Sequence, residues 1–148
     1  MKILIIEDEP GLRELLKLHV LMRAEDLLHI DCEAVAVGSL EEARQEFDRH
    51  DFAGVLSDGS FPTARQAVGV FGGVRENWPH LAGWAAKQEI PFVLLSGDVK
   101  AVAAARARPQ PILGFTKPRE IQAAIDALFD AVRVKRPPLF PREVEDVA

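Results

Sequence analysis

The chain has 148 residues, of which 48% are hydrophobic and 28% are charged. This length and balance are typical of one folded domain and exclude a wholly disordered or collagen-like chain. The formal net charge of -5, without a long basic run, argues against broad binding to the phosphates of nucleic acids. A single cysteine, Cys32, excludes an internal disulfide. Because neither a signal-like leader nor an apolar run of roughly 20 residues is present, we expect a cytoplasmic protein without membrane insertion.

The first strand is expected at residues 2–6, which read KILII and stop at a run of acids and turn formers. Glu7 and Asp8 therefore follow directly on a buried strand. A helix comes next, because side chains recur at the i, i+3, i+4 and i+7 spacing of a helix with one buried face: Leu12, Leu15, Leu16 and His19.

A second strand is expected at residues 30–37, and the next segment has the pattern of a helix start. Ser39 and Glu42 stand three positions apart, as in a capping box, ahead of apolar Ala43 and Phe47. A third strand at residues 52–56 leads into the turn-rich sequence SDGSFP. This places Asp58 just beyond a third buried strand.

Residues 63–78 carry several glycines and no clear periodicity, which favours a long loop that could dock a partner, with an irregular third helix as the alternative. A helix is expected at residues 79–88, with Pro79 in its first turn. With Pro79 in the first turn, Trp78 at the start of this helix shares one helical face with Leu81 and Ala85.

The last part of the domain repeats the alternation of strand and helix. Residues 90–95 read as a strand, and Asp98 can cap an alanine-rich helix at residues 99–106. Residues 112–115 form a last short strand. The closing helix after Pro118 is marked by Ile121, Ala124, Ile125, Leu128 and Val132.

Five strands that alternate with helices predict an α/β fold, a doubly wound five-stranded parallel sheet with helices on both faces. We expect one domain at residues 1–132 and an extended, Pro-rich and acidic tail at residues 133–148. Because the carboxyl ends of parallel strands meet at one edge, this edge collects most of the chemically interesting side chains. They are Glu7, Asp8, Asp58, Ser96, Asp98, Thr116 and Lys117.

Carboxylates gathered this closely repel one another unless a cation joins them, and all-oxygen ligands favour Mg²⁺. A carboxylate can also attack phosphorus to form an acyl phosphate, while a metal, an ammonium group and a hydroxyl share the charge of the transferring oxygens. The residues at this edge therefore predict a Mg²⁺ site at which one of the protein's own carboxylates could become phosphorylated.

Four segments, in order, resemble the receiver domains of two-component response regulators, which have a flavodoxin-like fold. ILIIEDEP resembles the family's first strand with its acidic pair, and SDGSFP matches the acceptor aspartate followed four residues later by proline. VLLSGD is similar to the strand that ends in a hydroxyl, and TKP to the family's lysine and cis-prone proline. The resemblance covers residues 1–132.

The resemblance implies that Asp58 accepts the phosphoryl group and that Ser96 and Lys117 bind its oxygens. It further implies that Mg²⁺ is held by Glu7, Asp8, Asp58 and the backbone carbonyl of Ser60. The implied donor is a phosphohistidine on a histidine kinase or histidine phosphotransfer protein, and the implied output is an unidentified protein partner. A homodimer is compatible with this scheme. Ser60 and Asp98 stand where the family tunes loss of the phosphoryl group.

The chain also departs from the family pattern. Gly114 stands where an aromatic switch residue is usual, and Asp58 and Ser96 are 38 positions apart, with the extra residues in the glycine-rich segment. Because fewer than 20 residues follow the last helix, we expect a stand-alone receiver without direct nucleic acid binding.

Two alternatives remain open at this stage. A pseudo-receiver would bind a partner constitutively without phosphorylation, and both Gly114 and the long insertion between Asp58 and Ser96 favour it. A phosphohydrolase with an aspartyl phosphate intermediate would commonly carry a second acid at the position of Ser60. Cys32 is expected to be a small buried hydrophobic residue rather than a nucleophile.

Overall fold

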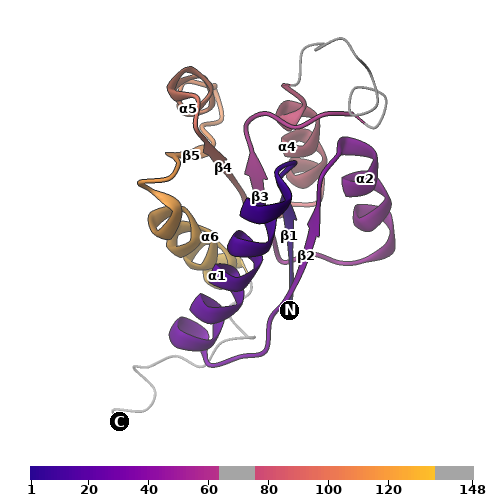
Figure 1. The fold of residues 1–148 in the computed structure, drawn as a ribbon, viewed down its shortest axis with the longest axis vertical. Coiled ribbons are helices and arrows are strands. Elements are labelled where there is room, and N and C mark those ends of the chain that lie inside the picture. Colours follow the sequence, from indigo (N-terminus) through magenta and orange to yellow (C-terminus); the bar gives the residue numbers. More distant parts are fainter. Residues whose placement is uncertain (64–75, 136–148) are drawn as a thin grey trace.

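The computed structural model describes residues 1–63 and 76–135. These residues form one parallel sheet of five strands in the order β2-β1-β3-β4-β5 (Figure 1). The strands are β1 (Lys2–Ile6), β2 (Glu33–Val37), β3 (Gly54–Asp58), β4 (Phe92–Ser96) and β5 (Leu113–Thr116). The helices are α1 (Pro10–Leu28), α2 (Leu40–Arg49), α4 (Trp78–Lys87), α5 (Val99–Arg106) and α6 (Ile121–Lys135).

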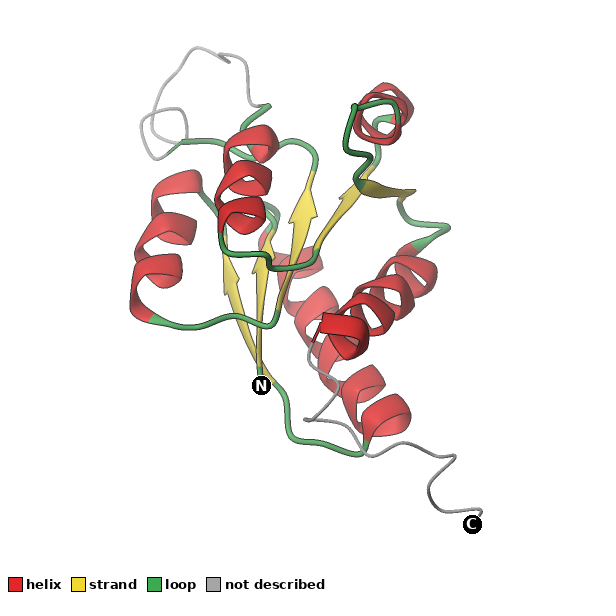
Figure 2. Cartoon of the chain, turned by 180° about the vertical axis from the view of Figure 1, so that it is seen from behind, coloured by secondary structure: helices red, strands yellow, loops and turns green. Residues whose placement is uncertain are grey.

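The helices cover both faces of the sheet, as the alternation of strands and helices predicts (Figures 1 and 2). Side chains of α1 and α6 bury one face, and those of α2, α4 and α5 bury the other. The buried strand residues alternate between these two cores: Ile3 and Ile5 join the first, and Leu4 and Ile6 the second. The predicted doubly wound α/β fold is confirmed.

The predicted buried face of α1 is partly wrong. Leu16 is buried as expected, but Leu15 is 45% exposed and His19 only half-buried. The buried face consists instead of residues four apart: Leu16, Val20, Ala24 and Leu28. Apolar residues occur on nearly every side of this helix, so their spacing alone fits more than one helical phase.

The strand ends also differ from the prediction in a systematic way. The predicted strand at 52–56 becomes Gly54–Asp58, and β4 and β5 also end one residue later than expected. Sequence patterns end a strand at its last apolar residue, whereas the hydrogen-bonded ladder continues through polar ones. Asp58 and Ser96 are therefore the last residues of β3 and β4 rather than the first of loops.

The described residues on either side of positions 64–75 contact one another. Phe61 and Glu76 form an isolated parallel bridge, and the Asn77 side-chain amide donates a hydrogen bond of 2.8 Å to the Phe61 carbonyl. The helix that follows buries Trp78, Leu81 and Ala85 together, as predicted. Most of the predicted 63–78 loop lies outside the described residues.

At the other end of the chain, α6 continues to Lys135, so residues 133–135 of the expected tail are helical. The rest of that tail lies outside the described residues. Within the part of the chain that the structure describes, no helix is long and apolar enough to cross a membrane.

Replacing Ser39 by alanine should destabilise the fold through the start of α2. The Ser39 side chain accepts a hydrogen bond from the Glu42 N–H at 3.3 Å, and the hydroxyl donates to Glu42 Oε1 at 3.2 Å. Loss of such an N-cap costs about 1 kcal/mol, which chemical denaturation would measure. Gln45→Ala, at an exposed position of the same helix, is the control. Equal stability of Ser39→Ala and the native chain would contradict the capping role.

Cys32 should react slowly with alkylating agents. It is half-buried, and burial raises the pKa of its thiol from an ordinary 9.0 to about 11. Below pH 9 the reactive thiolate should therefore be about 100-fold scarcer than in an unfolded chain, which iodoacetamide kinetics with and without denaturant would measure. Between pH 9 and 11 the unfolded chain releases a proton that the folded chain retains, so this group makes stability fall as pH rises. Equal alkylation rates in both states would contradict the prediction.

Candidate functional site

Two acidic residues from neighbouring strands lie side by side at the carboxyl edge of the sheet. Glu7 directly follows β1 and is 2% exposed, while Asp58 ends β3 and is 8% exposed. β1 and β3 are neighbours in the sheet, and β2 is added on one side of β1 whereas β3 to β5 follow on the other. In folds of this type, ligands bind at the carboxyl ends of the two strands between which the strand order changes direction. Carboxylate oxygens of Glu7, Asp8 and Asp58 all lie within 4.8 Å of one another. The predicted acidic cluster is therefore assembled.

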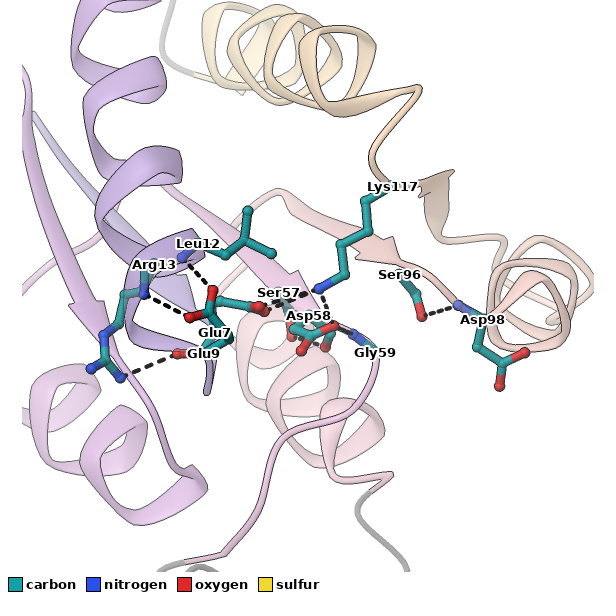
Figure 3. A network of polar contacts seen from close by, with 11 residues as sticks. Glu7, Glu9, Leu12, Arg13, Ser57, Asp58, Gly59, Ser96, Asp98 and Lys117 are labelled. Carbon is teal, nitrogen blue, oxygen red and sulfur yellow. Dashed lines mark hydrogen bonds and ion pairs between the residues drawn. The ribbon is translucent and has the colours of Figure 1, made fainter.

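Lys117 lies between the two buried carboxylates (Figure 3). Its Nζ donates to Asp58 Oδ1 at 2.9 Å and to Glu7 Oε2 and Oε1 at 3.2 and 3.3 Å. Lys117 directly follows β5, which is two strands away from β3, a separation of about 10 Å. Only a long side chain bridges that span, so the lysine is suited to this position.

The charges of the cluster are only partly balanced. Burial raises the pKa of Glu7 to about 8, with further increases from its hydrogen bond to Asp58 and from the Asp58 charge, while Lys117 opposes the shift. Burial lowers the pKa of Lys117, but the bonds and charges of Asp58 and Glu7 outweigh it, so the net pKa is raised. Near neutral pH, one ammonium group and a proton on Glu7 are therefore shared among three clustered carboxyl groups, and this all-oxygen donor set fits a divalent cation such as Mg²⁺ in place of the proton.

Ser96 reaches the same edge but does not join the ion-pair cluster. It is buried, and its Oγ accepts a hydrogen bond from the Asp98 N–H at 3.0 Å. Its carbonyl accepts the Lys117 backbone N–H at 3.0 Å, which fixes the start of the lysine relative to β4. Among the described residues, no side-chain hydrogen bond connects Ser96 to Asp58 or Lys117.

Two further predicted residues lie at the rim of the site. Ser60 is exposed, two residues beyond Asp58. The Asp98 carboxylate accepts the Lys100 N–H at 2.9 Å and so caps α5, as predicted. The resemblance to receivers implies that this carboxylate tunes phosphoryl loss, and in this structure one of its oxygens accepts the capping hydrogen bond.

Two supporting residues were missed by the sequence analysis. The Glu9 carboxylate accepts the N–H groups of Gly11 and Leu12 and caps α1. Arg13 Nη1 donates to the Glu7 carbonyl at 3.2 Å and so holds the loop that carries the acids. Glu9 was not distinguishable from its acidic neighbours, although its place before Pro10 and a helical pattern is a capping signal.

A third missed contact lies beside Lys117. The Thr116 N–H and Oγ1 donate to Glu120 Oε1 at 2.9 and 2.8 Å, and these bonds lower the pKa of Glu120. They fix the turn between β5 and α6, within which the Lys117-Pro118 peptide is cis. The backbone of Lys117 is thus held by its own hydrogen bond to Ser96 and by those of the preceding Thr116 to Glu120.

Gly114 is closed in by α5. A Cβ at this position would lie 3.3 Å from both Cγ1 and O of Val102. The Arg106 guanidinium donates to the Gly114 carbonyl through Nε at 3.0 Å and Nη2 at 2.6 Å. Phe115 instead packs against the core formed by α1 and α6. A side chain at position 114 therefore requires Val102 and the backbone of α5 to shift.

The chain matches no model of a protein family and no curated protein sequence. Solved structures do resemble it. A response regulator receiver domain protein from Clostridium thermocellum aligns over 91% of this chain and 96% of its own, with 18% identity and a TM-score of 0.66. A receiver protein from Sinorhizobium medicae covers 90% and 94%, with 21% identity and a TM-score of 0.64.

A response regulator from Thermotoga maritima, solved in complex with Mg²⁺ and BeF, aligns over 88% of this chain and 97% of its own. The identity is 19% and the TM-score 0.60. These matches cover nearly the whole of each solved structure and about nine-tenths of this chain. The chain therefore has the fold of response regulator receiver domains.

Proposed function

We propose that the chain is a response regulator receiver that transfers a phosphoryl group from a phosphohistidine donor to Asp58. The observation that carries this proposal is the placement of Lys117 within hydrogen-bond distance of both Asp58 and Glu7, with Asp8 beside them. A buried carboxylate held by an ammonium group at the carboxyl edge of a receiver fold is suited to accept phosphorus rather than only to stabilise the sheet.

In the proposed reaction, an Asp58 carboxylate oxygen attacks phosphorus and forms an acyl phosphate. The P–N bond to the donor histidine breaks, and its electron pair stays on the imidazole. Lys117 neutralises charge on the transferring oxygens, and the Ser96 hydroxyl donates a hydrogen bond to one of them. Glu7, Asp8, Asp58 and the Ser60 carbonyl would hold Mg²⁺, which when bound stabilises negative charge on the phosphoryl oxygens.

The proposed output is a protein partner that recognises the face formed by α5, β5 and α6. Lys117 connects this face to Asp58, because its backbone follows β5 and its side chain reaches the acid. A new phosphoryl group beside Lys117 would alter the charge that holds this contact. A histidine kinase or histidine phosphotransfer protein is the proposed donor, and the cytoplasm is the proposed location of the chain.

The second candidate is a pseudo-receiver that binds its partner without phosphorylation. The observation in its favour is the closed space at Gly114, where α5 is held to β5 by Arg106. In such a protein the acidic cluster and Lys117 would serve stability alone.

Intact-protein mass spectrometry separates the two candidates. The chain is incubated with acetyl phosphate and Mg²⁺, and in parallel with a chelator in excess. A metal-dependent gain of one phosphoryl group supports the receiver. Failure to gain it, from acetyl phosphate and from phosphorylated histidine kinase alike, would favour the pseudo-receiver.

A further inference from the structure

Gly59, which follows Asp58, lies against the side chain of Ser96. The register pairs Asp58 with Leu95, so Gly59 and Ser96 are the next neighbours along β3 and β4. A Cβ on Gly59 would lie 2.6 Å from Ser96 Cβ, closer still to Ser96 Oγ, and 3.6 Å from the Ala101 Cβ. Atoms do not approach this closely, so any side chain at position 59 requires Ser96 or the backbone to move.

The backbone conformation does not itself call for glycine here. Among the described residues, no glycine has a positive φ, so alanine could adopt the conformation of Gly59 without strain. The reason for glycine at this position is therefore the space that any side chain would take from Ser96. Glycine is needed here because it lacks a side chain, not because its backbone is flexible.

Neither neighbour can move without a loss at the site. The Ser96 Oγ accepts the Asp98 N–H, and the Gly59 N–H donates to Asp58 Oδ1 at 2.7 Å. Ala101 of α5, which is buried, closes the same space from another side, since its Cβ would lie 3.6 Å from a Cβ on Gly59. A side chain at position 59 would therefore displace either the serine hydroxyl or the peptide bonded to the proposed phosphoacceptor.

We infer that Gly59 is a positioning residue, whose lack of a side chain holds the Ser96 hydroxyl at the Asp58–Gly59 peptide, where it can meet the incoming phosphoryl group. This inference rests on the proposed function. Gly59 touches neither donor nor metal in this scheme and acts only through the Ser96 side chain.

The test compares Gly59→Ala with Gly97→Ala. Gly97 adjoins Ser96 in the sequence, but a Cβ there meets nothing within 4 Å, so it is a matched control. With acetyl phosphate and saturating Mg²⁺, we expect Gly59→Ala to slow labelling of Asp58 on the order of 100-fold and Gly97→Ala to leave it unchanged. Labelling of Gly59→Ala within about twofold of the native rate would overturn the inference.

A double variant separates positioning from general damage to the fold. If Gly59 acts through Ser96, the rates of Ser96→Gly and of Gly59→Ala/Ser96→Gly should be equal, because the hydroxyl is gone and the space is free. Mg²⁺ affinity by calorimetry should be the same in all variants. Multiplicative losses in the double variant would overturn the inference.

A structural readout keeps the inference apart from the proposed function. Hydrogen exchange at the Asp98 amide reports its bond to Ser96 Oγ, whether or not the chain is phosphorylated. We expect Gly59→Ala to lower the protection of this amide and Gly97→Ala to preserve it. If the native chain is not labelled, the proposed function fails, and unchanged Asp98 protection in Gly59→Ala would additionally refute the positioning by Gly59.

Discussion

Asp58→Asn should abolish labelling by acetyl phosphate in the presence of Mg²⁺. The amide has no anionic oxygen to attack phosphorus, whereas its size matches the carboxylate and leaves the packing at the end of β3 intact. Intact-protein mass spectrometry should show one added phosphoryl group on the native chain and none on the variant. The effect is expected to be complete because only one residue is the proposed acceptor.

The control for this variant is Asp51→Asn, which makes the same chemical change at an exposed position. It should be labelled as fully as the native chain. Labelling of Asp58→Asn to the native extent would refute Asp58 as the acceptor. A circular dichroism melt of both variants would establish that the comparison is made between folded proteins.

Lys117→Ala should lower the free energy of unfolding by about 3 kcal/mol, because it leaves the buried Asp58 carboxylate without its cation and Glu7 without its ammonium donor. The Lys117 side chain is only 17% exposed, so solvent cannot replace it fully. Urea denaturation in the presence of a chelator would measure the loss. Mg²⁺ should then raise the melting temperature of the variant more than that of the native chain, because the ion supplies the missing positive charge.

Lys87→Ala serves as the control, since Lys87 is exposed at the end of α4. Its effect on stability should stay within about 0.5 kcal/mol, and Mg²⁺ should stabilise it as it does the native chain. A Lys117→Ala variant as stable as the Lys87→Ala variant in chelator would contradict the role given to the lysine.

The clustering of the acidic residues could be predicted from the sequence alone. Glu7 and Asp58 each follow a short apolar run, and in a parallel sheet the ends of such runs meet at one edge regardless of the details of packing. Motif order then added Ser96 and Lys117 through the resemblance to receivers. The contact of the Lys117 side chain with Asp58, across β4, could not be predicted from the sequence. It depends on the strand order and on the turn fixed by Thr116 and Glu120.

Other features were missed because a residue type has several uses. Gly59 reads as a turn former within SDGSFP, and only the neighbouring strand reveals that the space beside it belongs to Ser96. Glu9 was not assigned a role because it stands in a run of acids, yet its carboxylate caps α1. The phase of α1 was uncertain for a related reason, since Leu15 and Leu16 satisfy the same spacing and only tertiary contact distinguishes them.

The closed space beside Gly114 limits how this sequence can change. A larger side chain there would meet Val102, and the carbonyl beneath it is held by Arg106. A side chain at position 114 requires α5 to shift against β5, because one of the two closest atoms belongs to the Val102 backbone. A smaller residue at 102 removes only the side-chain part of this contact, so the effects of substitutions at 102 and 114 are expected to depend on one another without either change fully compensating for the other.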